Sequence, residues 1–315
     1  MGFVKFNQAK QPTFVKCMIY GVAGVGKTTF ALSAPGPQAI IDFDNGLHRT
    51  NYQHRYNADV LQPIVWQDVI DALADVNAMR QYKTIIVDTI DKMMDYVISK
   101  VCGNRQPNIK DWGPINQEFT NFCRMIDNIG INVIFLSHEA KDQERDIKNK
   151  DVTKYKPSLR DKSFVYIQNS LDILGFMSRT DEAGRSTRML TLNSTICECK
   201  QPSGMPDVIV VPECLDKNGN KTIENDAFDK LILAPYVAGR QREAEAMNAY
   251  SALMSAIRND IASISDVDSA NAFLQRVESY QHIGNSKVEC RNLLWQKTTA
   301  LGLHYDKNVG AYVAA

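Results

Sequence analysis

The feature that most constrains this chain is a glycine-rich turn between an apolar run and a stretch compatible with a helix. Residues 17–29 read Cys-Met-Ile-Tyr-Gly-Val-Ala-Gly-Val-Gly-Lys-Thr-Thr and contain the pattern G-x-x-x-x-G-K-[ST] from Gly21 to Thr28. The strand-like run 14–20 precedes this pattern, and the helix-compatible stretch 28–33 follows it. A strand, a glycine-rich loop and a helix in this order are typical of a phosphate-binding loop, or P-loop.

Each residue type in this loop has a chemical task. The glycines let the backbone curl so that its N–H groups point at phosphate oxygens. Lys27 is expected to reach the β and γ phosphates, and the Thr28 hydroxyl is expected to bind Mg²⁺. ATP and Mg²⁺ are therefore the predicted cofactors. The predicted nucleotide-binding residues are Gly21, Val22, Ala23, Gly24, Val25, Gly26, Lys27, Thr28 and Thr29.

Strand-like runs alternate with helical stretches through most of the chain. Such alternation predicts an α/β fold with a mostly parallel sheet and crossover helices. The strand-like runs are 14–20, 39–43, 84–87, 132–137 and 171–177, and apolar residues recur at helical spacing in 68–79, 93–101 and 119–129. Two later runs between Gly and Pro turns, 188–192 and 207–211, predict antiparallel strands at the edge of the same sheet.

The pattern changes again toward the C-terminus, and three parts are predicted. They are an N-terminal extension at 1–12, an ATPase core at 13–236 and a small helical module at 243–315, with a break near Pro235 to Arg242. Apolar residues in the module recur at helical spacing, and such a stripe is more often core than binding groove.

The composition excludes fewer classes of function than the motifs do. The 36 basic and 36 acidic residues cancel, so a nucleic-acid surface would have to be local. Seven cysteines form no regular framework, and no apolar run approaches the ~18 residues of a membrane span. We expect reduced thiols, a cytoplasmic location and no membrane partner. A metal site at Cys197, Cys199 and Cys214 is disfavoured, because no fourth ligand stands at finger spacing.

Three further strands end in polar side chains that suit a nucleotide site. The apolar run 84–87 ends in Asp88, a carboxylate expected to hold Mg²⁺ through its water shell. Asp42 and Asp44 point the same way at the carboxyl edge of the sheet, and Asp44 is the candidate base that orients the attacking water. A turn or cap role is the alternative for Asp44. His138, after the next strand, is a candidate γ-phosphate sensor, with a structural histidine as the alternative.

Together these elements resemble the RecA-like recombinase core, and more closely the short phage ATPases of the Sak type. The resemblance covers about residues 13–212. It rests on the P-loop and on Ile-Ile-Asp-Phe-Asp-Asn-Gly, Ile-Ile-Val-Asp-Thr, Asp111-Trp-Gly-Pro-Ile-Asn116 and Phe-Leu-Ser-His-Glu. The resemblance implies a RecA-like P-loop fold, ATP binding and oligomerisation on single-stranded DNA. It also implies a role in phage recombination or replication, in the cytoplasm of a bacterial host.

Two departures from the family pattern bear on catalysis. The family usually has Glu where Asp44 stands, so we expect slow hydrolysis, with Glu139 as a second candidate base. Lys200 matches a lysine that in such ATPases reaches the γ phosphate of the neighbouring subunit, but Pro202 stands at the arginine-like position. One cation acting in trans would be a weaker catalyst than two. A solvated edge lysine is the alternative for Lys200.

The segment 141–162 is predicted to be a mobile loop directly after the sensor strand, where the resemblance places DNA binding. It carries eight basic and five acidic residues and shows no apolar periodicity. The ring of Tyr155 could stack on a base, with cations around it for the phosphates, a combination that is typical of sites for single-stranded nucleic acid. The alternative is that the segment is an ordinary solvated surface. The predicted DNA-binding residues are Lys148, Lys150, Lys154, Tyr155, Lys156 and Arg160. The loop 102–114 is a second candidate, although its Trp112 is favoured as a core anchor.

These observations predict an ATPase of phage DNA recombination or replication that is stimulated by single-stranded DNA and binds it as an oligomer. One alternative is a replication ATPase resembling a helicase loader, which acts on a protein partner, such as a single-strand binding or replication protein, through its C-terminal helices. The other is a nucleotide-responsive binding module with little catalysis.

Overall fold

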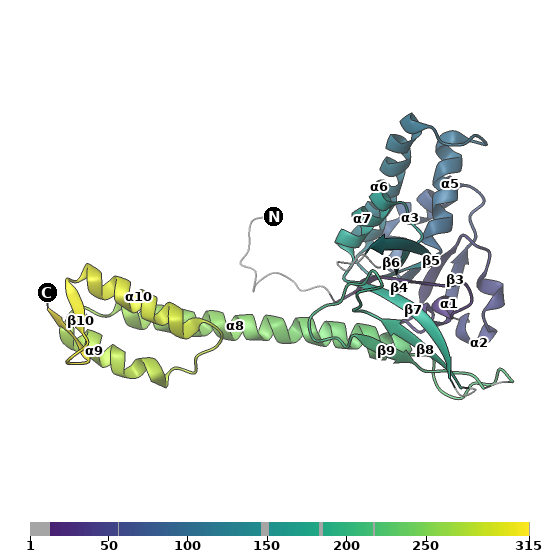
Figure 1. Cartoon of the computed structure of the whole chain (residues 1–315). Coiled ribbons are helices and arrows are strands. Elements are labelled where there is room, and N and C mark those ends of the chain that lie inside the picture. The colour runs from purple at the N-terminus through teal and green to yellow at the C-terminus, as the bar shows by residue number, and fades with distance from the viewer. Residues whose placement is uncertain (1–12, 56, 146–150, 183–184, 217, 315) are drawn as a thin grey trace. The chain divides into compact units, whose positions relative to one another are not determined.

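The computed structural model describes residues 13–314 except 56, 146–150, 183–184 and 217 (Figure 1). The chain separates into two compact units, one formed by Pro12–Gly239 and the other containing Arg240–Ala315. The sequence predicts that the core ends at 236 and that the helical module begins at 243, and these two boundaries remain predictions.

A mostly parallel sheet forms the centre of the larger unit. Its strands lie in the order β3-β2-β4-β5-β1-β7-β8-β9. Neighbours from β3 to β7 in this order are parallel, and the pairs β7–β8 and β8–β9 are antiparallel. The bounds are β1 Lys16–Gly21, β2 Gln38–Asp42, β3 Ala58–Leu61, β4 Thr84–Asp88, β5 Asn132–Arg145, β7 Ile173–Glu182, β8 Arg185–Thr191 and β9 Val208–Val211. The predicted parallel sheet with antiparallel edge strands is confirmed.

Helices cover both faces of this sheet. The helices of the larger unit are α1 Lys27–Ala31, α2 Tyr52–Arg55, α3 Trp66–Ala74, α4 Val76–Met79, α5 Ile90–Cys102, α6 Trp112–Ile129 and α7 Asp161–Ser170, with 3-10 turns at Leu47–Arg49 and Ile109–Asp111. Helices α3, α5, α6 and α7 pack on one face, around Val87 and Phe135 (Figure 1). Helix α1 packs on the other face, around Ile86 and Ile134. Successive strand residues point to opposite faces, so these central strands are apolar throughout.

One helix predicted as continuous is divided. The apolar pattern over 68–79 spans α3 and α4, which meet at Asp75. The Asp75 carboxylate accepts hydrogen bonds from the backbone N–H groups of Asn77 and Ala78, each at 3.0 Å. Asp is a strong N-cap residue, and it starts a new helix here.

The segment predicted as a loop after the sensor strand is instead a β-hairpin. Strand β5 continues to Arg145, and β6, Asp151–Pro157, pairs with it in antiparallel register. Asp142 lies opposite Lys154, and such opposite-charge pairs stabilise neighbouring strands. The dense charges hid this strand pattern in the sequence.

The C-terminal unit is built from helices and one small hairpin. It contains the greater part of α8, Ala234–Ala262, followed by α9 Val267–Arg276, a 3-10 turn at Val277–Ser279, α10 Ser286–Ala300, β10 Leu303–Asp306 and β11 Ala311–Ala314. Its core contains Ile257, Phe273, Leu294 and Tyr312. The predicted stripes on α8 and α9 contribute to this core. On α10 the predicted stripe is wrong, because Val288, Trp295 and Leu301 are exposed and Cys290 and Leu294 are the buried residues. The β10–β11 hairpin was not predicted.

One helix runs through the segment from Pro235 to Arg242, in which the sequence predicts the break between core and module. A π-helical turn, Asp229–Leu233, leads directly into α8, which passes through Pro235. Proline removes one helical hydrogen bond and crowds the carbonyl four residues before it. π turns are among the local irregularities by which helices accommodate such a mismatch. Among the described residues, no helix combines the length and apolar composition that a bilayer-spanning segment needs.

β1 and β7 approach each other so closely at Gly21 that there is no room for a side chain at this position. A Cβ atom at Gly21 would lie 2.2 Å from the carbonyl oxygen of Met177. We expect Gly21→Ala to lower the free energy of unfolding by about 1–3 kcal/mol, because backbone must move to relieve the clash. Chemical denaturation measures this change. Gly113→Ala, where a Cβ would meet no atom within 4 Å, is the control and should cause no loss. Equal stability of Gly21→Ala and the wild type would contradict this packing.

Candidate nucleotide-binding site

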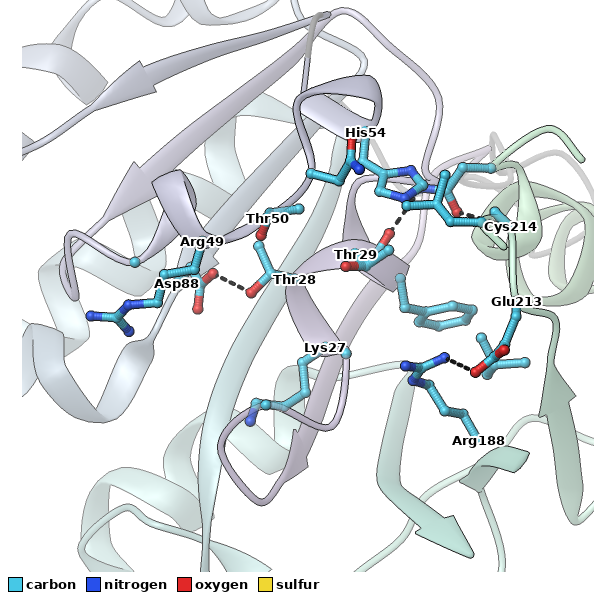
Figure 2. Close-up of a pocket in the computed structure, with 18 of the residues that line it drawn as sticks. Lys27, Thr28, Thr29, Arg49, Thr50, His54, Asp88, Arg188, Glu213 and Cys214 are labelled. Atoms are coloured by element: carbon cyan, nitrogen blue, oxygen red, sulfur yellow. Dashed lines mark hydrogen bonds and ion pairs between the residues drawn. The ribbon is translucent and has the colours of Figure 1, made fainter. Parts of the chain in front are cut away.

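One cavity of about 540 Å³ lies at the carboxyl ends of the central strands (Figure 2). Its volume falls in the range of about 300–1,000 Å³ that is usual for small-molecule sites. Asp44, Asp88, Thr89 and His138 line it. The P-loop contributes Ala23, Gly24, Gly26, Lys27, Thr28 and Thr29. The structure thus brings both predicted carboxylates and the predicted sensor to the P-loop.

Strand order explains why residues far apart in sequence meet here. β1, which leads into the P-loop, lies beside β5, with Gly21 opposite His138. β4 lies on the other side of β5, with Asp88 opposite Leu136. The carboxyl ends of neighbouring parallel strands meet at one edge of the sheet, which is where open α/β sheets bind ligands.

Lys27 is held at the P-loop by the loop itself. Its Nζ donates hydrogen bonds to the carbonyl oxygens of Gly21 at 2.8 Å and Val22 at 2.9 Å. Burial lowers the pKa of Lys27, and the nearby carboxylates of Asp88 and Asp91 oppose that effect. The ammonium is therefore fixed among carboxylates at the place where the sequence predicted phosphate binding.

The two residues that the sequence predicts as the Mg²⁺ site, Thr28 and Asp88, are in contact. The Thr28 hydroxyl donates to Asp88 Oδ2 at 2.7 Å (Figure 2). Burial raises the pKa of Asp88 to about 6, and the carboxylates of Asp42 and Asp44 add to the rise. A hydroxyl and a carboxylate are oxygen ligands that Mg²⁺ prefers, and the ion would relieve this crowding of negative charge.

The rest of the ion's coordination would come from phosphate and water. In the described part of the chain, no three His, Cys, Asp or Glu side chains cluster in a way that could hold a metal ion. A few protein oxygens completed by waters and substrate phosphates are the usual mode for Mg²⁺. The residues present therefore fit Mg²⁺ bound together with a nucleotide.

The two aspartates after β2 have different surroundings. Asp42 is buried, and its carboxylate accepts hydrogen bonds from the N–H groups of Gly46 at 3.0 Å and Leu47 at 3.1 Å. Asp44 lines the cavity, with the Thr89 hydroxyl 3.5 Å from its Oδ2. Burial raises the pKa of Asp44, while His138 opposes the rise. Asp42 thus shapes the turn, and Asp44 faces the site as a base would; its catalytic role remains a prediction.

His138 has a partner that sequence reasoning missed. Its backbone N–H donates to Asp91 Oδ1 at 3.0 Å, and its Nδ1 lies 2.7 Å from Asp91 Oδ2. This hydrogen bond raises the pKa of His138. Burial opposes ionisation of Asp91, but the bonds to His138 outweigh it and lower the pKa of Asp91. The available signal was a second carboxylate three positions after Asp88, in the first turn of α5.

Two arginines of the cavity were also missed. Arg49 follows β2, and Arg188 lies on the edge strand β8, which the sequence indicated only as an antiparallel strand. The Arg188 Nε donates to the carbonyl oxygen of Val25 at 3.0 Å, and its NH1 lies 2.8 Å from Glu213 Oε1 (Figure 2). The remaining wall comes from Val211–Asp216 and Asn225 on one side, and from Thr50, Asn51 and His54 on the other.

Lys200 does not line the cavity. Its Nζ donates to the carbonyl oxygens of Gln168, at 3.1 Å, and Leu171, at the C-terminal end of α7. A cation here complements the partial negative charge of the helix end. The structure therefore gives Lys200 a capping role within its own chain, and action on a neighbouring subunit remains a prediction.

The predicted DNA-binding residues have partners within the chain wherever the structure gives their contacts. Tyr155 stacks on Phe176, with ring centroids 5.1 Å apart. Lys156 pairs with Asp142 at 2.9 Å. The Arg160 guanidinium lies 3.2 Å from the ring centroid of Trp112, which packs against the core as the sequence favoured. Lys154 lies on β6 and has partners of its own. Lys148 and Lys150 fall outside the described residues.

The fold and the site together define a P-loop ATPase with a RecA-like core. A family model described as an AAA domain matches residues 13–200, more than half of the chain. The chain belongs to this AAA domain family.

The chain is also similar in part to two solved archaeal structures. The flagellar accessory protein FlaH from Methanocaldococcus jannaschii is 12% identical, with 69% of this chain and 93% of FlaH covered and a TM-score of 0.39. A KaiC-like protein from Pyrococcus horikoshii is 14% identical, with 63% and 89% covered and a TM-score of 0.39. No curated protein matches the chain.

The contact between His138 and Asp91 predicts a pH dependence. The pair is favourable while Asp91 is ionised and His138 is protonated. Because the pKa of His138 is raised, this stabilisation is lost as the pH rises through that raised value; it is also lost at acid pH, as Asp91 takes up its proton. We expect Asp91→Asn to lower the pKa of His138, measured by NMR titration, with the His304 signal as internal reference. An unchanged His138 titration would contradict the pairing.

Proposed function

We propose that this protein hydrolyses ATP with Mg²⁺ and binds single-stranded DNA as an oligomer during phage recombination or replication. One observation carries the ATPase part: Lys27, the Thr28–Asp88 pair and His138 meet around a single cavity of nucleotide size. The DNA part is supported by the resemblance to the Sak-type phage ATPases and by the hairpin that continues the strand of His138.

In this proposal five side chains of the cavity have defined tasks. Lys27 binds the phosphates, and Thr28 and Asp88 hold Mg²⁺, which when bound neutralises phosphate charge. Asp44 orients the attacking water, and its raised pKa moves it toward the range in which a carboxylate accepts a proton effectively. His138, oriented by Asp91 through Nδ1, donates a hydrogen bond to the γ phosphate.

Two contacts offer a route from the nucleotide to the hairpin. The carbonyl oxygen of His138 accepts a hydrogen bond of 2.8 Å from the backbone N–H of Ser158, just after β6. The hydroxyl of Tyr20, the residue before the P-loop, donates to the carbonyl oxygen of Tyr155 at 2.9 Å. The base of the hairpin is thus bonded to both sides of the phosphate site. A shift of His138 or of the P-loop on hydrolysis would move it.

The DNA part predicts that single-stranded DNA stimulates ATP turnover. We expect an increase of about fivefold or more, the lower range of allosteric coupling. Phosphate release at saturating ATP, with oligonucleotides of increasing length, measures it. Turnover indifferent to DNA at every length would contradict DNA dependence and leave an ATPase that acts on another partner.

Lys27→Ala should lower turnover by roughly 100-fold or more, both with and without DNA, because it removes the cation at the phosphates. Circular dichroism shows whether this variant still folds. Undiminished hydrolysis in a folded Lys27→Ala protein would place the ATPase activity elsewhere.

Asp44 is one methylene shorter than the Glu that the family usually has at this position, and we expect this shorter side chain to limit the rate of ATP hydrolysis. Asp44→Glu brings the carboxylate closer to the water and should raise turnover by up to about tenfold. Asp44→Asn keeps the size but removes the base, and should lower turnover by about 100-fold. If neither substitution changes turnover, Asp44 is not the base, and Glu139→Gln becomes the variant to test.

A further inference from the structure

Arg188 and Glu213 form an ion pair beside the P-loop that the ATPase roles above do not use. Arg188 lies on β8, and Glu213 follows the end of β9, so the two side chains come from the antiparallel edge of the sheet. Both line the nucleotide cavity. The Arg188 NH1 lies 2.8 Å from Glu213 Oε1 (Figure 2).

Arg188 is held against the last glycine of the loop. Its Nε donates to the carbonyl oxygen of Val25 at 3.0 Å. A Cβ atom at Gly26 would lie 3.1 Å from the same Nε, so the guanidinium occupies the space beside Gly26. Gly26 directly precedes Lys27. The guanidinium therefore lies at the part of the P-loop where backbone N–H groups meet phosphate oxygens.

The bond to Glu213 is of a kind that is easily exchanged. The Glu213 side chain is 50% exposed and the Arg188 side chain 27% exposed, and a single nitrogen to oxygen contact joins them. Such exposed pairs contribute little to stability, because solvent screens them. Arginine and phosphate instead form two parallel charge-assisted hydrogen bonds, which are markedly stronger.

We propose that Arg188 binds the nucleotide's phosphates from within the same chain, and that Glu213 holds the guanidinium in place until a nucleotide takes it over. Glu213 thereby tunes affinity, because ATP must displace it from Arg188. The inference rests on nucleotide binding at this cavity and not on DNA binding.

Equilibrium binding of a fluorescent ATP analogue with Mg²⁺ and without DNA tests this proposal. Arg188→Ala should weaken binding by roughly tenfold or more, the effect of losing a charge-assisted contact. Arg188→Lys keeps the charge but cannot form two parallel hydrogen bonds with a phosphate. Its affinity should therefore lie between those of the wild type and Arg188→Ala. Glu213→Gln should tighten binding by about two- to fivefold, because it releases Arg188.

A matched control separates release of Arg188 from simple loss of negative charge. Asp216→Asn removes another carboxylate of the cavity, one whose hydrogen bonds are to Asn218 and Asn220. It should tighten binding less than Glu213→Gln does. If Arg188 only clamps the edge strand to the P-loop, Glu213→Gln will weaken binding or leave it unchanged, and that result would overturn the proposal. Equal tightening by Asp216→Asn would also overturn it.

The proposed DNA dependence and the proposed role of Arg188 can be refuted independently of each other. The wild type and Lys27→Ala, measured in the same assay, show whether the cavity binds nucleotide at all. If the wild type binds and Lys27→Ala does not, an unchanged affinity in Arg188→Ala refutes the role of Arg188 alone. Absence of DNA stimulation in a turnover assay would not alter these affinities.

Discussion

The hydrogen bond between Thr28 and Asp88 is the contact on which the site depends. It joins the helix that follows the P-loop to the end of β4, across 60 positions of sequence. The bond is possible because β5 alone separates β1 from β4 in the sheet, so both strands end at the same edge. The same strand order puts His138 between them. One topological constraint therefore fixes the phosphate loop, the proposed Mg²⁺ ligands and the sensor relative to one another.

This arrangement concentrates negative charge in a buried place. Asp44, Asp88 and Asp91 lie near Lys27, and Asp42 acts on both Asp44 and Asp88. Burial raises the pKa of Asp88 and of Asp44. A carboxyl group whose pKa is raised on folding makes the folded state less stable as the pH rises through that range. Sites that bind cations commonly carry such a cost, because it is relieved when the ion arrives. The empty fold thus carries a cost in stability that Mg²⁺ and nucleotide, bound as proposed, would relieve.

The sequence predicted the parts of the site that follow local rules. The P-loop is a contiguous pattern, and Asp44, Asp88 and His138 each follow an apolar strand, so strand ends were enough to bring them together. Asp91 and Arg188 could not be predicted in the same way. Their roles depend on which helix turn faces β5 and on how the edge strand packs against Gly26, and both are tertiary facts. The hairpin β5–β6 was missed because its charges mask the alternation typical of a strand.

The central claim is that nucleotide binds at the P-loop and that this binding changes the β5–β6 hairpin. Hydrogen–deuterium exchange tests this claim most directly. With ATP and Mg²⁺ the account predicts slower exchange in residues 21–29 and, through Ser158 and Tyr155, in residues 153–158. The C-terminal unit should be unaffected. Protection confined to other parts of the chain, with the P-loop unchanged, would contradict the account.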